Sequence, residues 1–212
     1  MQIDYKLEKE QLINNMNESF SDIYHYFEEI DFKTNDEYKK LNSTYYKLVA
    51  MHYQSFLILL HNNSFSSAIV LSRTILEVAV KSFYCELIEK QKNKKVENIF
   101  SKEYKFFEML EQLDKYKDKS GAEFNGFFIQ FSKKDLATYE KLSLFTHAKG
   151  EYIKAFYKHD GLTFTSKHIY EISNLIYKLF LSLSIFRLLV YGYFDKTNYL
   201  IVKYKLHLID RE

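Results

Sequence analysis

Residues 66–90, SSAIVLSRTILEVAVKSFYCELIEK, decide the fold. Apolar residues occupy nearly every face of the helix that this stretch predicts, which is typical of a helix buried at the centre of a domain. Three charged residues, Arg73, Glu77 and Lys81, interrupt it at intervals of four. Because residues four apart lie on the same face of a helix, we expect a charged stripe on an otherwise apolar element.

The composition favours helices along the whole chain. Its 212 residues include no proline and only five glycines. Since these two residues mark most turns, a chain that nearly lacks them is expected to form long elements with few tight turns. No internal repeat or low-complexity linker occurs. We therefore predict one helical domain over residues 1–212, with its core in residues 35–195.

Apolar residues recur at intervals of three and four on both sides of this central stretch, as in amphipathic helices. Thr34-Asn-Asp-Glu37 has the Thr-x-x-Glu pattern of a capping box, which marks a helix start. We predict an all-α bundle of about six helices, in which the helix at 66–90 packs beside a second long apolar helix at 166–194. The other helices are expected at 4–31, from the capping box at Thr34 to about His61, at 96–116 and at 132–145.

The C-terminal tail, residues 196–212, admits two interpretations. Residues 202–208, VKYKLHL, alternate between apolar and polar side chains, which is strand periodicity. Tyr199, Val202, Leu206 and Ile209 also fit one face of a helix. Because no partner strand is evident, the helix is favoured and the strand stays open.

The near-balance of positive and negative residues excludes a function that depends on a strong electrostatic field of the whole protein. The net charge is +2, so nucleic-acid binding cannot be argued from the total. Only Arg73, Arg187 and Arg211 are arginines, against 27 lysines. Arginine carries a rigid, planar fork of donors, whereas lysine is a flexible point charge. We therefore expect Arg73 and Arg187, both inside predicted helices, to occupy positions that need this fork.

Several common sites are absent from the sequence. The seven histidines include no His-x-x-x-His pair, and the glycines form no phosphate-binding loop or Gly-x-Ser-x-Gly elbow. We therefore predict no metal and no cofactor. Cys85 is the single cysteine, which excludes an internal disulfide and a multi-cysteine zinc site. Its apolar helix indicates a small buried hydrophobe.

One candidate site combines two distant segments. Arg73, Glu77 and His147 are the candidate catalytic residues, and Lys81 and Lys149 the candidate substrate-binding residues. Such a cationic pocket with one carboxylate suits a phosphodiester, because arginine and lysine hold the charge while histidine transfers a proton near neutral pH. The structural alternatives are an internal ion pair between Arg73 and Glu77, and a histidine favoured by the dipole at a helix C-terminus.

A family resemblance rests on the same residues. The segment Ala68-Ile-Val-Leu-Ser-Arg-Thr-Ile-Leu-Glu77, followed later by Thr146-His147, resembles a group of bacterial all-helical proteins similar to HEPN-like bundles. The resemblance implies a helical fold and a place in abortive-infection or toxin systems. HEPN ribonucleases carry a histidine four to six residues after an arginine, and neither Arg73 nor Arg187 has one.

Two functions follow as hypotheses. The first is a HEPN-like defence or stress protein that binds or cleaves RNA or a nucleotide, and the clustered Arg, Glu, His and Lys favour it. The second is a non-catalytic helical module that binds a protein partner, which the near-neutral charge and the missing histidine spacing favour.

The 19 Tyr and 19 Phe exceed what one small core is expected to bury, so we predict a homodimer. The polar N-terminus, without a signal-peptide pattern, predicts a cytoplasmic protein that does not enter a membrane.

Overall fold

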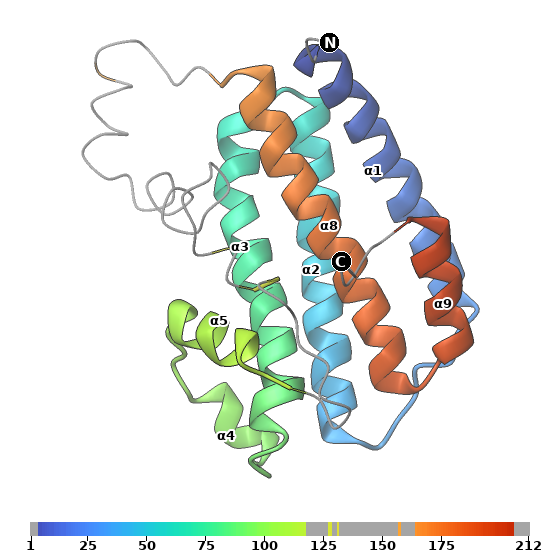
Figure 1. Ribbon diagram of the computed structural model, residues 1–212, viewed down its shortest axis with the longest axis vertical. Coiled ribbons are helices and arrows are strands. Elements are labelled where there is room, and N and C mark those ends of the chain that lie inside the picture. The colour runs from blue at the N-terminus through green and yellow to red at the C-terminus, as the bar shows by residue number, and fades with distance from the viewer. Residues whose placement is uncertain (1–3, 118–126, 129–130, 132–156, 158–163, 206–212) are drawn as a thin grey trace. The chain divides into compact units, whose positions relative to one another are not determined.

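The computed structural model describes residues 4–117, 127–128, 131, 157 and 164–205 (Figure 1). Within these residues the chain forms seven α-helices and one π-helical turn. This confirms the predicted all-α fold. The elements are α1 (Tyr5–Glu28), α2 (Glu37–His61), α3 (Phe65–Tyr84), η1 (Cys85–Glu89), α4 (Val96–Phe100), α5 (Phe106–Asp114), α8 (Ser166–Tyr191) and α9 (Phe194–Lys203).

The residues group into two compact units, and α2, α3 and α8 each contribute one part to each unit. The described part of the first unit consists of residues 4–30, 50–76, 157 and 164–178. That of the second consists of residues 31–49, 77–117, 127–128, 131 and 179–205. Each unit has its own buried aromatic and aliphatic side chains.

In the first unit, α1 packs along α8 and α2. Asp4 caps α1, its side chain accepting hydrogen bonds from the backbone N–H groups of the next turn. The Ser19 hydroxyl lies 2.7 Å from the Tyr177 hydroxyl of α8. The ring of Phe20 packs 5.7 Å from that of Tyr53 on α2, measured between centroids, and Tyr53 is fully buried. The amphipathic helix predicted at residues 4–31 therefore buries the face that its periodicity indicates.

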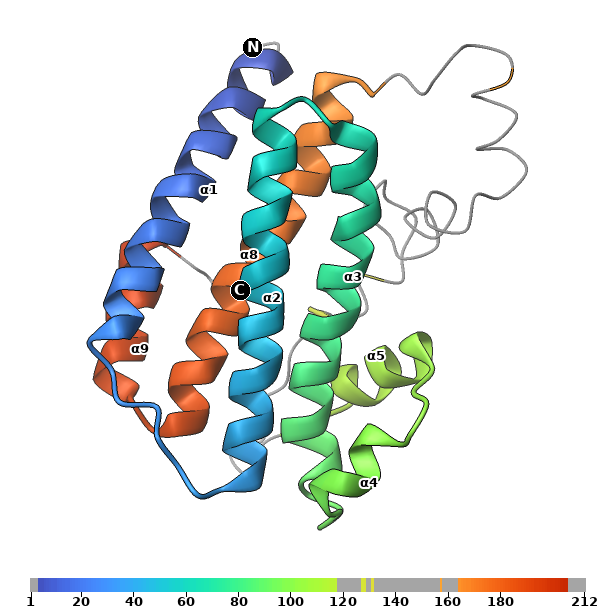
Figure 2. The same ribbon diagram turned by 180° about the vertical axis from the view of Figure 1, so that it is seen from behind.

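The short turn between α2 and α3 makes these helices antiparallel neighbours (Figure 2). Asn63 adopts a left-handed conformation with φ 54°. Its N–H donates to the carbonyl of Leu60, and the N–H of Ser64 donates to that of Leu59. These two bonds form a Schellman motif, which ends α2 and reverses the chain within three residues.

In the second unit, the end of α3 packs against α8. The Phe83 and Phe186 rings lie 4.5 Å apart between centroids, which confirms within this unit that the two long apolar helices are neighbours. α3 then continues into the π-helical turn η1, whose Cys85 is buried. Burial raises the pKa of the Cys85 thiol to about 11, so it stays protonated and unreactive at neutral pH. This confirms its prediction as a small buried hydrophobe.

The single helix predicted for residues 96–116 was wrong. The structure has two short helices there, α4 and α5, separated by residues 101–105 (Figures 1 and 2). The physical reason lies in a tertiary contact, because Lys102 and Tyr104 leave the helical path and point their polar ends at the Glu89 carboxylate. Periodicity within residues 96–116 carries no sign of this distant partner.

Glu89 ends η1 with a side chain that has no exposed surface. One carboxylate oxygen lies 2.6 Å from Lys94 Nζ and accepts a 3.4 Å hydrogen bond from the Tyr104 hydroxyl. The other lies 3.4 Å from Lys92 Nζ and 3.6 Å from Lys102 Nζ. Burial by itself would raise the pKa of Glu89, but the hydrogen bond from Lys94 and the neighbouring ammonium charges hold it below its usual value.

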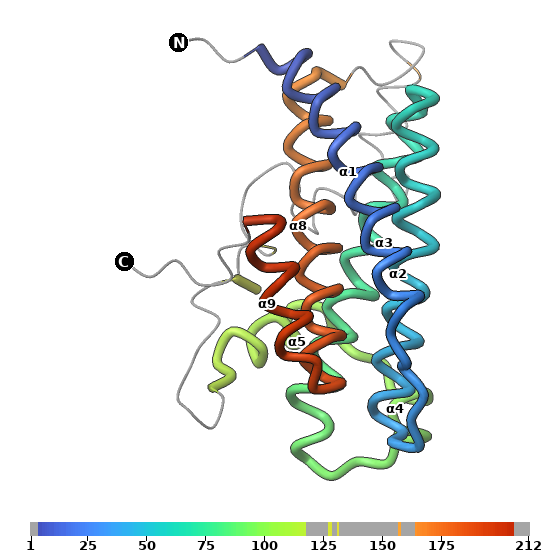
Figure 3. The backbone as a smooth tube through the Cα atoms, turned by 90° about the vertical axis from the view of Figure 1, so that its right-hand side faces the viewer, coloured from blue at the N-terminus to red at the C-terminus, as the bar shows by residue number. Residues whose placement is uncertain are grey.

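α8 ends at Tyr191 in a second Schellman motif. Gly192 has φ 84°, its N–H donates to the carbonyl of Leu189, and the N–H of Tyr193 donates to that of Leu188. The chain then turns back into α9, which runs beside the end of α8 (Figures 1 and 3). Up to Lys203 the tail is therefore helical, the favoured interpretation, and residues 206–212 lie outside the described part.

The length and apolar composition of α8 would allow it to cross a membrane. In the structure, however, 72% of its most apolar 18-residue window is buried, as in the core helix of a soluble protein. The predicted helix at 132–145 lies outside the described residues.

Replacing Glu89 should reveal a pH-dependent contribution to stability. Because its pKa is lower in the folded protein, this contribution is present above the ordinary Glu pKa of about 4.3 and is lost as the pH falls through the folded value. We expect Glu89→Gln to lower the free energy of unfolding at pH 7 by about 2 kcal/mol. The difference from the unsubstituted protein should shrink below about pH 4.

Chemical denaturation between pH 7 and pH 3 measures this difference. Glu97→Gln, on the exposed face of α4, is the control and should change stability by less than about 0.5 kcal/mol at every pH. A loss for Glu89→Gln that is equal at pH 7 and pH 3 would contradict the assignment of its charge.

Candidate functional site

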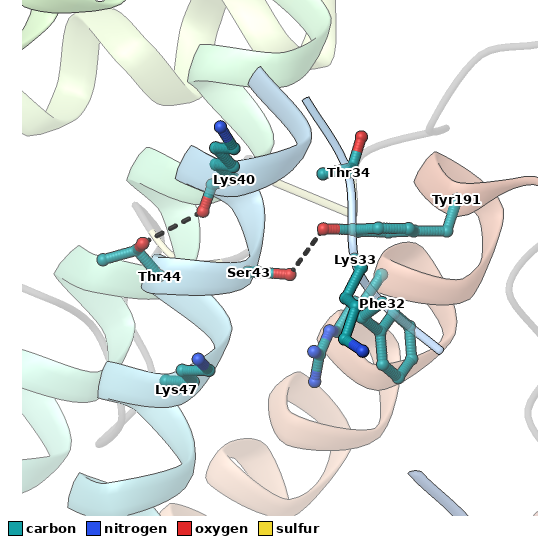
Figure 4. Close-up of a pocket in the computed structure, with 9 residues that line it drawn as sticks. Phe32, Lys33, Thr34, Lys40, Ser43, Thr44, Lys47 and Tyr191 are labelled. Atoms are coloured by element: carbon teal, nitrogen blue, oxygen red, sulfur yellow. Dashed lines mark hydrogen bonds between the residues drawn. The ribbon is translucent and has the colours of Figure 1, made fainter. Parts of the chain in front are cut away.

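A pocket of about 360 Å³ opens in the second unit (Figure 4). Three chain segments form it: the residues that precede α2, the first turns of α2, and the end of α8. The lining residues are Phe32, Lys33, Thr34, Lys40, Ser43, Thr44, Lys47, Arg187 and Tyr191. Its volume lies within the range of small-molecule sites, which is about 300–1,000 Å³.

The start of α2 fixes the first wall of the pocket. The side chain of Asp36 accepts the N–H of Lys39 at 3.0 Å, and its carbonyl accepts the N–H of Lys40, so Asp36 is the N-cap. The capping-box prediction, in which Thr34 caps the helix, was wrong. The Thr34 hydroxyl instead accepts the N–H of Asp36 at 3.1 Å, a local turn that leaves the threonine in the pocket wall.

One face of α2 supplies the second wall. Lys40, Ser43, Thr44 and Lys47 stand at intervals of three and four, which places them on one side of the helix (Figure 4). Lys40, Thr44 and Lys47 are exposed, so their polar ends reach solvent at the mouth of the pocket. The Thr44 hydroxyl donates to the Lys40 carbonyl at 3.0 Å, which leaves its oxygen able to accept a further bond.

Arg187 lies at the buried side of the pocket, with 7% of its surface exposed. Its guanidinium carbon lies 3.7 Å from the centroid of the Phe32 ring and 4.6 Å from that of Tyr46. Two aromatic faces thus hold the cation, an arrangement that suits a planar guanidinium better than an ammonium. Burial lowers the pKa of Arg187, but arginine starts so high that it stays charged at neutral pH.

Hydrogen bonds from Tyr191 join α8 to α2 beside this cation. Its hydroxyl lies 2.9 Å from the Ser43 hydroxyl and donates to the Lys39 carbonyl at 3.1 Å. Its ring meets Phe32 edge-to-face at 5.0 Å between centroids. Behind these residues, burial raises the pKa of Tyr46 to about 12, so the ring that faces Arg187 belongs to a neutral phenol. These contacts hold the pocket walls in place.

The pocket can bind an anion. Lys33, Lys40, Lys47 and Arg187 contribute four positive charges, and no carboxylate is among the lining residues. Arginine at a buried position presents a donor fork, and lysine ammonium groups at the mouth add charge that can move with a ligand. The hydroxyl groups of the walls supply further polar contacts. Among the described residues, no group of three or more His, Cys, Asp or Glu is placed to hold a metal ion.

The site predicted from the sequence lies elsewhere. Arg73, Glu77 and Lys81 all belong to α3, where Arg73 is buried and the other two are half-buried. Their spacing keeps them on one face of this regular helix, as predicted. His147 and Lys149 lie outside the described residues. The composite site of all five residues therefore stays a prediction.

No protein-family model, no curated protein and no solved structure matches the chain.

Sequence reasoning noted Arg187 but missed the pocket around it. The residues that surround it come from positions 32–47 and 191, and a polar helix face with lysines is the ordinary solvent face of an amphipathic helix. One signal could have found the site: no Asp or Glu occurs between Glu37 and Glu77. An acid-free polar face that contains Lys40 and Lys47 indicates a surface with an uncompensated positive charge.

Replacing Arg187 should show that the pocket depends on a planar cation. Arg187→Lys keeps the charge but loses the stacking between two rings, and we expect the free energy of unfolding to fall by about 1–2 kcal/mol. Lys47→Arg, at the exposed mouth, is the matched control and should stay within about 0.5 kcal/mol. Denaturant unfolding of the two variants measures both values, and equal stabilities would show that stacking contributes nothing.

Proposed function

We propose that the protein binds a nucleotide unit, free or within an RNA chain, in the cationic pocket of the second unit. One observation carries this proposal: four cationic side chains, one of them a buried arginine, line a pocket that no carboxylate lines. Phosphate is the common biological anion that lysine and arginine bind together. A pocket of about 360 Å³ has room for a ligand of this size.

The hydroxyl groups support a nucleotide over inorganic phosphate alone. Ser43 and Thr44 lie beside the lysines on α2 and can bond ribose or base atoms while the cations hold phosphate. The resemblance of Ala68–Glu77 and Thr146-His147 to HEPN-like proteins supports the further proposal that this binding serves a defence or stress response. Cleavage of RNA is a separate proposal, which rests on the acid–base role predicted for His147.

Neutralising the pocket lysines should weaken nucleotide binding while the fold persists. For Lys40→Gln combined with Lys47→Gln, we expect the affinity for a nucleoside 5′-monophosphate to fall about 10- to 100-fold, because charge-assisted bonds to phosphate are lost. The affinity for single-stranded RNA should fall as well, and its dependence on salt should become shallower. Calorimetric titration measures these constants.

Lys115→Gln is the control for this experiment, since Lys115 pairs with Glu111 and does not line the pocket. It should bind as the unsubstituted protein does. If the unsubstituted protein binds neither probe, or if the double variant and the control bind equally, the pocket is not the site. Gel analysis of the RNA after incubation decides whether binding leads to cleavage.

A second candidate function, a protein-interaction module, is favoured by an apolar surface on α2 in the first unit. Met51 and Ile58 are each 55% exposed and lie on one helix face with Ser55 between them. No charged Asp, Glu, Lys or Arg side chain interrupts α2 after Lys47. A second copy of this chain would cover such a surface in the predicted homodimer.

Charging this surface tests the interaction. If Met51 and Ile58 lie in a dimer interface, Met51→Lys with Ile58→Lys should yield monomers, because two lysines would be buried without partners. Phe100→Lys, which changes an exposed ring on α4, should leave the association unchanged. Sedimentation velocity across a concentration series measures the outcome, and an unsubstituted protein that is monomeric throughout would contradict the dimer.

A further inference from the structure

A second cationic site lies in the same unit, outside the pocket. We define the Glu89 lysine cluster as Glu89, Lys92, Lys94 and Lys102. Three ammonium groups lie within 3.6 Å of one carboxylate, and the three lysine side chains remain 34–45% exposed. None of them forms an ion pair with another carboxylate among the described residues. The cluster therefore carries a surplus of two positive charges.

This surplus exceeds what the fold requires. Lys94 at 2.6 Å and the Tyr104 hydroxyl already engage one carboxylate oxygen, and a single ammonium balances the Glu89 charge. The additional ammonium groups repel one another, and the proximity of Lys94 lowers the pKa of Lys102. Three other lysines of the same unit, Lys90, Lys105 and Lys115, each pair with one carboxylate. Two positive charges that no carboxylate of the cluster balances attract an anion from solution.

We propose that the Glu89 lysine cluster binds a phosphate group, carried by a small ligand or by the backbone of an RNA. A phosphate monoester carries a charge close to −2 at neutral pH, which balances the surplus. Two neighbouring phosphodiesters of an RNA chain supply the same charge. The buried carboxylate has a positioning role, because it holds three flexible lysines on one side of the π-helical turn.

Aromatic side chains contact the lysines of the cluster, and one of these aromatic residues belongs to α2. Lys92 lies over the Tyr84 ring at 5.8 Å and Lys102 over the Tyr104 ring at 4.7 Å, so aromatic faces orient two of the cations. The Tyr38 hydroxyl, in the first turn of α2, donates to the Lys94 carbonyl at 2.8 Å. The same turn of α2 leads into Lys40 of the pocket.

Amide NMR with inorganic phosphate as the probe tests the proposal and locates the binding. In the unsubstituted protein, phosphate should shift the amide resonances of residues 90–104 in a saturable way. Lys92→Gln with Lys102→Gln keeps the Lys94–Glu89 pair and should weaken this binding about 10- to 100-fold. Lys167→Gln, in the first unit and paired with Glu171, should leave it unchanged.

A second variant removes no lysine. The side-chain oxygen Oε1 of Gln112 accepts a hydrogen bond from Lys92 Nζ at 3.2 Å, so Gln112→Glu would place a second carboxylate in the cluster. It should weaken the response to phosphate, because it lowers the surplus of the cluster from two positive charges to one. The proposal is overturned if residues 90–104 do not respond to phosphate, or if both variants bind phosphate as tightly as the unsubstituted protein does.

The RNA arm of the same experiment distinguishes the two sources of phosphate. A single-stranded oligoribonucleotide should shift residues 90–104 together with residues 32–47 if the ligand is an RNA backbone. It should leave residues 90–104 unshifted if the cluster takes a small phosphate. A failure of the proposed pocket function would appear separately, as an absent response of residues 32–47 to every probe.

Discussion

A charged side chain that enters a protein interior loses its hydration, and other groups must take the place of the water. Arg187 meets this constraint with partners from a distant part of the chain, and Glu89 with partners from the segment that follows it. Two aromatic faces from positions 32 and 46 enclose the arginine. Three lysines from the segment after η1 surround the carboxylate. Each buried charge therefore decides where an otherwise irregular segment lies, and both candidate sites form around one.

The two charges are accommodated by different chemistry, and this explains the choice of residue at each. A guanidinium is planar and weakly hydrated, so it can stack between rings in a chain that otherwise uses lysine. Lysines reach Glu89 from three positions because their stems are long and flexible. Both arrangements leave positive charge that faces solvent, at the pocket mouth and around the cluster. The near-zero net charge of the chain hides this local asymmetry.

Local sequence rules predicted what local forces determine. Helical periodicity and the lack of proline indicated α1, α2, α3 and α8, because each buries an apolar face whose spacing is visible in the sequence. The break at residues 101–105 and the N-cap at Asp36 were missed, since the first depends on Glu89 and the second on a choice between two neighbouring capping residues. The pocket was missed because its walls meet only after folding. Arg187 was noticed because its residue type was rare in this chain.

The π-helical turn at Cys85–Glu89 gives this region a tolerance of length that its side chains do not reveal. A π turn holds one residue more than an α turn over the same stretch, so the chain that follows it keeps nearly the same angular phase. Loss of a single residue between Cys85 and Ile88 would therefore restore an α-helical path without rotating the next side chains. The Glu89 carboxylate would still face its lysines, although the turn had become one residue shorter. The same deletion within α3 would instead rotate everything after it by about 100° and turn the carboxylate away from the cluster.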